Sequence, residues 1–395
     1  MTVRRVGIVT TSRADYGALV WLLREVQAHP GLELLLFVTG THLSPEFGMS
    51  VRAIEADGFP IRERIEMLLS SDTAVGATKS VGAGLLGFAD AFQRSRPDVL
   101  VLFGDRTELW APAIAALLQQ IPVAHIHGGE TSQGAVDEAV RHSVTKIASI
   151  HFPAADAYRR RIIQLGEDPD RVFAFGALGL DGLHRASLLS QSDLEERLGF
   201  ALAGTVAIVT FHPVTLEPNT ALAQLEHVLR AIEKSGIKAV FTQANADAEG
   251  RHINNRLRAF CAAAPERYRL YDTLGQLVYL SCLKHVQLMI GNSSSGLIEA
   301  PSLRLPVVNV GDRQRGRLAP RNVISVAASY DEIFAGIDRA TSSPFLQSLE
   351  GMGNPYDPCQ DGKVGYRIAE TLYTVDLSPG RLKKVFHDVA IAEAA

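Results

Sequence analysis

Short apolar runs alternate with amphipathic stretches along almost the whole chain, and this alternation constrains the fold more than any other feature. Strands that are apolar throughout are typical of parallel sheets covered by helices on both faces. Regular strand–helix alternation predicts a doubly wound α/β sheet with right-handed crossovers. The strands expected in the first part are Val6–Thr10, Leu34–Val38, Val99–Phe103, Val123–His127, Ile150–Phe152 and Val172–Phe175. The helices expected between them include Tyr16–Ala28, Lys79–Arg94, Leu109–Gln119 and Ala155–Leu165.

The alternation pauses across residues 176–204, which are rich in glycine, serine and charge, and then restarts. A chain of 395 residues is also too long for one ordinary domain. We therefore expect two Rossmann-like doubly wound domains facing a cleft, formed by residues 1–178 and 179–364. The strands expected in the second domain are Val206–Phe211, Lys238–Thr242, Tyr268–Tyr271, Val286–Ile290, Val307–Val310 and Val323–Val326.

Residues 365–395 follow the second domain and begin with one more helical stretch, Gly365–Tyr373. We expect this stretch to pack back on the first domain. The tail after Pro379 is expected either to be partly disordered or to pack on a neighbour.

Charge and composition exclude several kinds of partner. The chain has 43 acidic and 39 basic residues and a net charge of −4, which argues against a nucleic-acid-binding surface. The longest basic run, Arg159–Arg161, is expected to be a solvated helix face. No apolar stretch is long enough to cross a bilayer, and no signal peptide follows Met1. The three cysteines are scattered and the histidines show no metal-ligand pattern, so we expect a cytoplasmic protein without a metal, a nucleic-acid partner or a membrane partner.

The segment His125–Lys146, HIHGGETSQGAVDEAVRHSVTK, is the first place to look for chemistry. It begins at the end of an apolar run and continues into two glycines and Glu130. In open α/β sheets, ligands bind outside the carboxyl ends of the strands. We therefore expect Glu130 to reach a ligand site.

The helix after this loop has a predicted buried stripe of Val136, Val140, Val144 and Ile147. Two pairs of polar residues are four apart and share a helix face. They are Asp137 with Arg141, and Glu138 with His142. The alternative for both is a solvated helix pair, which is the favoured interpretation for Glu138 with His142. The position of Asp137 in the first turn favours the site.

Three further turns follow expected strands. Arg13 begins a helix after the first strand, where a cation and backbone N–H groups suit an anion. Asp105 and Arg106 place a carboxylate beside a guanidinium in the turn GDRTE, and His212 precedes a proline at the end of another strand. The alternatives are a capping turn with a surface arginine, an ordinary N-cap, and a structural histidine.

The turn GNSSSG (291–296) is a stronger candidate, because a buried strand leads into it and a helix follows. Backbone N–H groups, hydroxyls and the helix dipole would meet at an anion there. The turn is neither a Walker A loop nor a G-x-G-x-x-G fingerprint. Glu299, one turn further, is placed to reach ribose hydroxyls, and Arg313 in GDRQRGR (311–317) suits a diphosphate. The alternatives are a serine N-cap and a solvated charge run.

In this order along the chain, the segments resemble the UDP-N-acetylglucosamine 2-epimerase family, specifically its hydrolysing branch, which serves sialic and legionaminic acid biosynthesis. The resemblance extends from about Val6 to Tyr373. The non-hydrolysing branch has a GLRT-like segment where this chain has Gly128-Gly129-Glu130. The segments that carry the resemblance are TSRADYG (11–17), TGTHLSPEFG (39–48), GDRTE (104–108), HIHGGE with DEAVRH (125–142), HPVT (212–215), GNSSSGLIEAPS (291–302), GDRQRGR (311–317) and NPYDPCQDG (354–362), the last with more residues than the family's NPYGDG ending.

The resemblance implies a glycosyltransferase-B fold, no cofactor, and a homo-oligomer such as a dimer or tetramer. It implies that UDP-N-acetylglucosamine and water give N-acetylmannosamine and UDP, by anti elimination of UDP and hydration of the glycal. The catalytic residues expected are Asp105, Glu130, Asp137 and His212; which carboxylate removes the C2 proton stays open. The residues expected to bind substrate or UDP are Arg13, Arg106, Arg141, His142, Asn292, Ser293, Ser294, Ser295, Gly296, Glu299 and Arg313.

Three alternatives stay open. The same chemistry could act on UDP-2,4-diacetamido-2,4,6-trideoxyglucose, the legionaminic acid precursor. A glycosyltransferase would use the same fold and release UDP only with an acceptor. A nonenzymatic nucleotide-sugar binder would keep the anion site but would not need Glu130 or Asp137.

Overall fold

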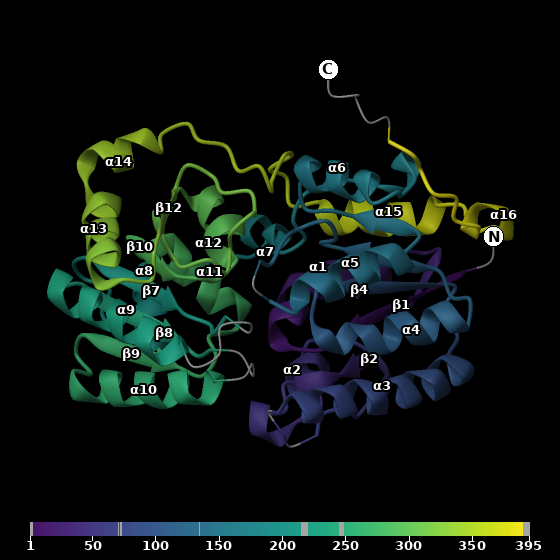
Figure 1. Ribbon diagram of the computed structural model, residues 1–395, viewed down its shortest axis with the longest axis horizontal. Helices are drawn as coiled ribbons and strands as arrows, with labels where there is room; N and C mark the ends of the chain where they lie inside the picture. The colour runs from purple at the N-terminus through teal and green to yellow at the C-terminus, as the bar shows by residue number, and fades with distance from the viewer. Residues whose placement is uncertain are drawn as a thin grey trace. The chain divides into compact units, whose positions relative to one another are not determined.

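The computed structural model describes residues 3–69, 71, 73–133, 135–214, 220–244 and 249–389. Thr215 of the HPVT segment and the end of the C-terminal tail lie outside these residues. The chain forms two compact units (Figure 1). The first consists of Met1–Glu130, Asp137–Asp181 and Pro358–Ala395, and the second of Thr131–Val136 and Gly182–Asp357. Within the described ranges, no helix has the length and apolar character needed to cross a membrane.

The first unit is built on a six-stranded parallel sheet with the strand order β3-β2-β1-β4-β5-β6. The order reverses direction between β1 and β4, so their carboxyl ends flank the topological switch point where ligands bind in such sheets. The strands are β1 (Arg4–Thr10), β2 (Leu32–Thr39), β3 (Ile61–Ile65), β4 (Val99–Phe103), β5 (Val123–Ile126) and β6 (Ile150–Phe152).

Helices cover both faces of this sheet, as near-continuous apolar strands require. Side chains of α1, α2 and α15 share one buried cluster with β1 and β2, and those of α3, α4 and α5 share the other with β4. The helices are α1 (Arg13–Ala28), α2 (Val51–Ala56), α3 (Ala74–Arg94), α4 (Trp110–Leu118), α5 (Asp137–Ile147), α6 (Asp156–Gln164), α15 (Val364–Thr374) and α16 (Pro379–Leu382).

The second unit repeats this plan in a parallel sheet with the order β12-β11-β10-β7-β8-β9. Its direction reverses between β7 and β10. The strands are β7 (Val206–Thr210), β8 (Lys238–Thr242), β9 (Tyr268–Tyr271), β10 (Leu288–Gly291), β11 (Val307–Val310) and β12 (Val323–Val326). The helices are α7 (Leu180–Arg185, which begins in the first unit), α8 (Gln191–Leu198), α9 (Ala221–Ser235), α10 (Gly250–Ala263), α11 (Gly275–His285), α12 (Ser295–Ile298), α13 (Tyr330–Thr341) and α14 (Ser343–Ser348).

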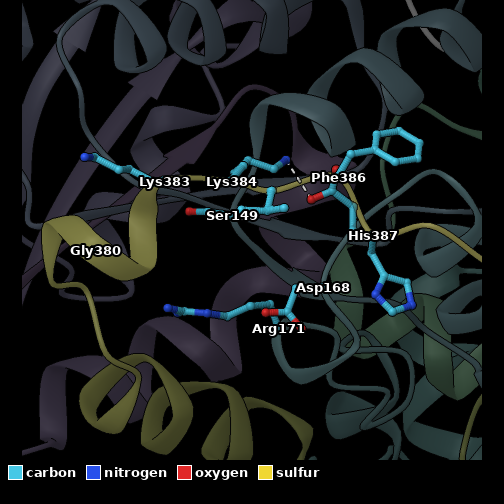
Figure 2. Close-up of a pocket in the computed structure, with 10 residues that line it drawn as sticks. Ser149, Asp168, Arg171, Gly380, Lys383, Lys384, Phe386 and His387 are labelled. Carbon is cyan, nitrogen blue, oxygen red and sulfur yellow. Dashed lines mark ion pairs between the residues drawn. The ribbon is translucent and has the colours of Figure 1, made fainter.

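The C-terminal segment returns to the first unit, where α15 packs against α1. Beyond α16, residues 383–387 form a strap over the loop that follows α6, residues 165–171. Lys384 pairs with Glu167 at 2.6 Å (Figure 2). It also donates to the carbonyl oxygen of Ala148 at 2.6 Å. The ring of Phe386 lies where a Cβ on Gly166 would be. The strap and this loop enclose a cavity of about 390 Å³.

Three predictions about elements were wrong. Val172–Phe175 is not a strand, because only Val172 forms a β-bridge, to His151, and the aromatic rings that follow pack on Phe152. The edge strand β3 was not predicted, since the half-buried Glu63 lies between its two exposed arginines and interrupts the apolar alternation. Val136 is 40 % exposed because α5 begins one residue later, at Asp137.

Candidate functional site

The loop between β5 and α5 is fixed by close packing around its two glycines. A Cβ on Gly128 would lie 2.9 Å from the Thr145 hydroxyl of α5, and one on Gly129 would lie 2.6 Å from the carbonyl oxygen of Tyr158. Gly129 also has a φ of +76°, in the region that favours glycine. Arg161 donates to its carbonyl oxygen at 2.6 Å, so part of the basic run is structural rather than a solvated face.

His125 lies within β5 and is wholly buried, and both ring nitrogens have partners. Nδ1 lies 3.1 Å from the Thr145 hydroxyl and Nε2 lies 2.8 Å from the Gly104 carbonyl oxygen. Burial lowers the pKa of His125 to about 3, against the opposing effect of the Gly104 hydrogen bond. His125 is therefore a neutral structural side chain that ties the ends of β4 and β5 together.

Glu130 and Asp105 meet at the guanidinium of Arg141. Arg141 extends from α5 with only 2 % of its side chain exposed, its Nη2 bonds to Asp105, and its Nη1 lies 3.7 Å from Glu130 Oε2. Glu130 is equally buried, whereas Asp105 is 23 % exposed. Two carboxylates held by one cation at the ends of β4 and β5 can exchange protons with a ligand above the sheet.

His127, directly after β5, adds an imidazole to this cluster. Its Nδ1 lies 2.7 Å from Glu130 Oε1, and its ring packs on Phe103 with the centroids 4.9 Å apart. His127 was not among the predicted site residues. The signal that could have done so is its place at a strand end three residues before a carboxylate.

The other predicted residues of α5 and of the β4 turn have local partners. His142 Nε2 lies 3.2 Å from Glu138 Oε1, as the four-residue spacing predicts. Arg106 pairs with Glu108 at 3.1 Å. Asp137 is half-buried at the first residue of α5.

The turn after β1 is organised by Asp15, which sequence reasoning passed over in favour of Arg13. Asp15 accepts bonds from the Thr10 hydroxyl at 2.6 Å and from the Thr11 N–H at 2.8 Å, and it lies 3.8 Å from His42 Nε2. Burial opposes its charge, yet the bonds from His42, Thr10 and Thr11 hold its pKa below the ordinary value. Asp15 thus fixes the turn, and Arg13 is exposed at the start of α1.

In the second unit, the ends of β7 and β10 are joined by Asn292. Its side chain accepts from the His212 N–H at 2.7 Å and donates to the His212 carbonyl oxygen at 2.8 Å. Gly291 makes this approach possible, since a Cβ at its φ of +133° would fall on the carbonyl oxygen of Thr210. The buried side chain of His212 is held at the switch point of the second sheet.

The serine turn leads into α12, which is only one turn long, so a large helix dipole is not available there. What the turn offers is hydroxyls and backbone N–H groups. Ser295 is buried and accepts from the Tyr279 hydroxyl at 2.8 Å, while Ser293 and Ser294 are half-buried. Gly296 packs on β11, where a Cβ would lie 2.8 Å from Val307 Cγ1, and Glu299 follows at the end of α12.

Arg313 joins this group from the loop after β11. Its Nη1 donates to the carbonyl oxygen of Asn292 at 3.1 Å, and Gln314 donates to the same oxygen at 2.8 Å. The second sheet thus brings together His212, Asn292 and Arg313. Gln314 and Tyr279 were not predicted, because side chains that support a turn leave no pattern of their own.

The fold is shared with solved nucleotide-sugar enzymes. The structure superposes with a TM-score of 0.79 on UDP-GlcNAc 2-epimerase from Neisseria meningitidis bound to UDP-GlcNAc, at 18 % identity, covering 93 % of this chain and 99 % of that one. The Methanocaldococcus jannaschii UDP-GlcNAc 2-epimerase in complex with UDP-GlcNAc and UDP gives 0.74, at 16 % identity and with 93 % and 99 % covered. Two doubly wound, six-stranded parallel sheets define a glycosyltransferase-B-like fold.

Sequence relatives identify the family. The family model for UDP-N-acetylglucosamine 2-epimerase matches residues 24–373. UDP-N,N'-diacetylbacillosamine 2-epimerase (hydrolyzing) of Legionella pneumophila is 35 % identical, covering 97 % of this chain and 99 % of the relative. GDP/UDP-N,N'-diacetylbacillosamine 2-epimerase (hydrolyzing) of Campylobacter jejuni is 36 % identical, covering 88 % and 90 %. The chain belongs to the UDP-N-acetylglucosamine 2-epimerase family, in its hydrolysing branch.

Proposed function

We propose that the protein hydrolyses and epimerises a UDP-linked 2-acetamido sugar, releasing UDP and the free sugar inverted at C2. The observation that carries this proposal is the cluster in which Arg141 holds Asp105 and Glu130 at the strand ends of the first sheet. Proton removal and return at one carbon needs acid–base groups of this kind. Membership of the hydrolysing branch supplies the reaction class.

The C2–H bond is a poor acid because no carbonyl group adjoins it. Departure of UDP from C1 builds oxocarbenium character, and this acidifies the C2 proton. Loss of the proton gives a glycal, and water then adds at C1 while a proton returns to C2 from the opposite face. In this scheme Asp105, Glu130 and Asp137 are the carboxylates available for proton transfer.

The leaving diphosphate needs hydrogen-bond donors and positive charge. In the proposed function these come from Arg13, Arg313 and the hydroxyls of Ser293 and Ser294, while Glu299 receives the ribose hydroxyls. The buried His212 is assigned to the diphosphate, since Asn292 fixes its backbone on both sides.

Two sugars are candidate substrates. UDP-N-acetylglucosamine is the substrate expected from the sequence, and a relative named for it in Neisseria meningitidis is 30 % identical. The two relatives at 35 % and 36 % identity are named for N,N'-diacetylbacillosamine, the 2,4-diacetamido-2,4,6-trideoxy sugar. On this ground we propose the UDP-linked diacetamido sugar as the preferred substrate.

Proton NMR in deuterated water tests the proposal, with each nucleotide sugar offered separately to the full chain. We expect free UDP together with a free manno-configured sugar that carries deuterium at C2, and faster release from the diacetamido substrate. Faster turnover of UDP-N-acetylglucosamine would reverse the substrate assignment. UDP binding without turnover of either sugar would contradict the enzyme proposal and favour a nucleotide-sugar binder, and UDP release only with an acceptor would favour a glycosyltransferase.

A further inference from the structure

We propose that His127 is a catalytic base that removes the C2 proton, with Glu130 as the carboxylate that orients it and stabilises its protonated form. This inference rests on the proposed function and adds an imidazole to the carboxylates considered so far. Four features of His127 carry it: its backbone conformation, its bond to Glu130, its second ring nitrogen, and its place in the sheet.

The backbone of His127 has a φ of +62°, in the left-handed region that residues with a Cβ rarely adopt. Such a conformation is strained and persists where the surroundings fix it. Here the His127 N–H bonds to the Phe152 carbonyl oxygen at 3.0 Å, and the packed Gly128 and Gly129 follow directly. Strain held in place by packing on both sides is typical of functional positions.

The bond to Glu130 sets the tautomer of His127. A carboxylate beside Arg141 accepts rather than donates, so His127 Nδ1 carries the hydrogen of the 2.7 Å bond. Nε2 then has a free lone pair and can act as a base. A buried carboxylate in this position orients the imidazole and stabilises the imidazolium that forms when a proton is taken, as in hydrolase triads.

Nε2 of His127 is buried and has no hydrogen-bond partner among the described residues. Leaving a buried acceptor unsatisfied is unfavourable, and a ligand that donates to it removes that penalty. His125, two residues earlier in β5, differs from His127 because both of its ring nitrogens have hydrogen-bond partners. His127 also follows the carboxyl end of β5, beside the switch-point strands, where a ligand of the first sheet would lie.

The proposed step moves one proton and two electron pairs. Nε2 takes the C2 proton, the C–H electron pair forms the C1=C2 bond, and the C1–O bond breaks with its pair leaving on UDP. His127 becomes an imidazolium paired with Glu130 and returns its proton to solvent. A different acid then delivers a solvent-derived proton to the opposite face of C2, where the C1=C2 electron pair forms the new C–H bond. Water bonds to C1 and releases a proton to solvent, so deuterium enters at C2 in deuterated water.

The left-handed backbone of His127 allows a substitution that removes the imidazole and adds no backbone strain. Glycine favours a φ of +62°, so His127→Gly removes the imidazole without straining the loop. We expect turnover of the better substrate to fall by about 10²- to 10⁴-fold, the range attributed to general acid–base catalysis, with UDP affinity kept. Free imidazole is expected to restore turnover in proportion to its concentration, and substrate deuterated at C2 should slow the restored reaction.

A matched control is His151→Gln, which alters another buried histidine–glutamate pair. His151 lies on β6, next to β5, and its Nε2 is 3.0 Å from Glu167 Oε2. Imidazole should not raise its turnover. The proposal for His127 is overturned if His127→Gly stays within about tenfold of wild-type turnover, if imidazole restores nothing, or if the restored reaction shows no isotope effect. Wild-type turnover in the same assay separates these outcomes from failure of the proposed function, which an inert wild type would show.

Discussion

Arg141 illustrates what a single buried side chain does in this protein. Its guanidinium contacts Asp105 and Glu130 while only 2 % of the side chain reaches solvent. A buried cation between two carboxylates offsets a repulsion that would otherwise oppose the folded state. The fork of donors on one planar group also fixes both carboxylates in direction, which a lysine cannot do.

We therefore expect Arg141→Met to lower the free energy of unfolding by about 3 kcal/mol, the usual result of removing one partner from a buried ion pair. Turnover should fall with it, since the carboxylates lose their orientation. Urea unfolding followed by fluorescence measures the first effect. Arg141→Lys is the control that keeps the charge, and it should recover stability more than turnover. A methionine variant as stable as wild type would contradict this account.

At the scale of elements, the turns after the strands carry the site, and each depends on a local packing requirement. The turn after β10 is an example, because Asn292 donates its N–H to the Thr210 carbonyl oxygen at 3.1 Å across Gly291. No other residue can hold this approach, since a Cβ would coincide with that oxygen.

Gly291→Ala should therefore separate the ends of β7 and β10 and weaken UDP binding by at least about tenfold, corresponding to about 1.4 kcal/mol. Isothermal titration with UDP measures the change. The matched control is Gly353→Ala in the same unit, because a Cβ added at Gly353 would meet open space. This variant should bind UDP as wild type does. Equal affinity in the two variants would show that the turn does not form part of the UDP site.

At the scale of the whole molecule, burial shifts the pKa of titratable groups in both units. In the first unit, burial lowers the pKa of His125 to about 3, and burial likewise lowers the pKa of His151. Glu167 is buried, but bonds from His151, Lys146 and Lys384 hold its pKa at about 2. Among the described residues of the second unit, the buried groups with shifted pKa are tyrosines and cysteines, all raised by burial.

His125, His151 and Glu167 each predict the same sign for the pH dependence of stability. Each pKa lies below that of the unfolded chain, so stability is present above the unfolded value and is lost as pH falls toward the folded value. Stability is lost between pH 6.5 and about 3 for His125, and between pH 4.5 and about 2 for Glu167. Both tryptophans, Trp21 and Trp110, belong to the first unit.

Acid titration should therefore change tryptophan fluorescence before half of the far-ultraviolet circular dichroism signal is lost. Glu167→Gln removes the contribution of this carboxylate to stability. The variant should therefore be less stable to urea near neutral pH, and its stability should fall less between pH 4.5 and about 2. Coincident fluorescence and dichroism transitions, or an unchanged slope in the variant, would show that these groups do not control the acid stability of the first unit.

Most strands and long helices could be predicted from sequence, because an apolar run or an amphipathic period repeats its signal over several residues. The helix Arg13–Ala28 and the strand Val206–Thr210 are examples, correct to within a few residues. The edge strand β3 and the false strand at Val172–Phe175 show the limit. Whether an extended segment joins a sheet depends on a partner strand, and no local pattern reports one.

The sequence by itself determined the class of the fold, the turns where polar groups follow strands, and the family, since these depend on local order along the chain. Only the tertiary structure decided which groups meet. Asp105, Glu130 and Arg141 span 37 residues of sequence, counted from 105 to 141, and come together because parallel strands end at one edge. The bond between His127 and Glu130, the two satisfied nitrogens of His125, and the role of Asp15 likewise depend on packing geometry, which residue types alone do not specify.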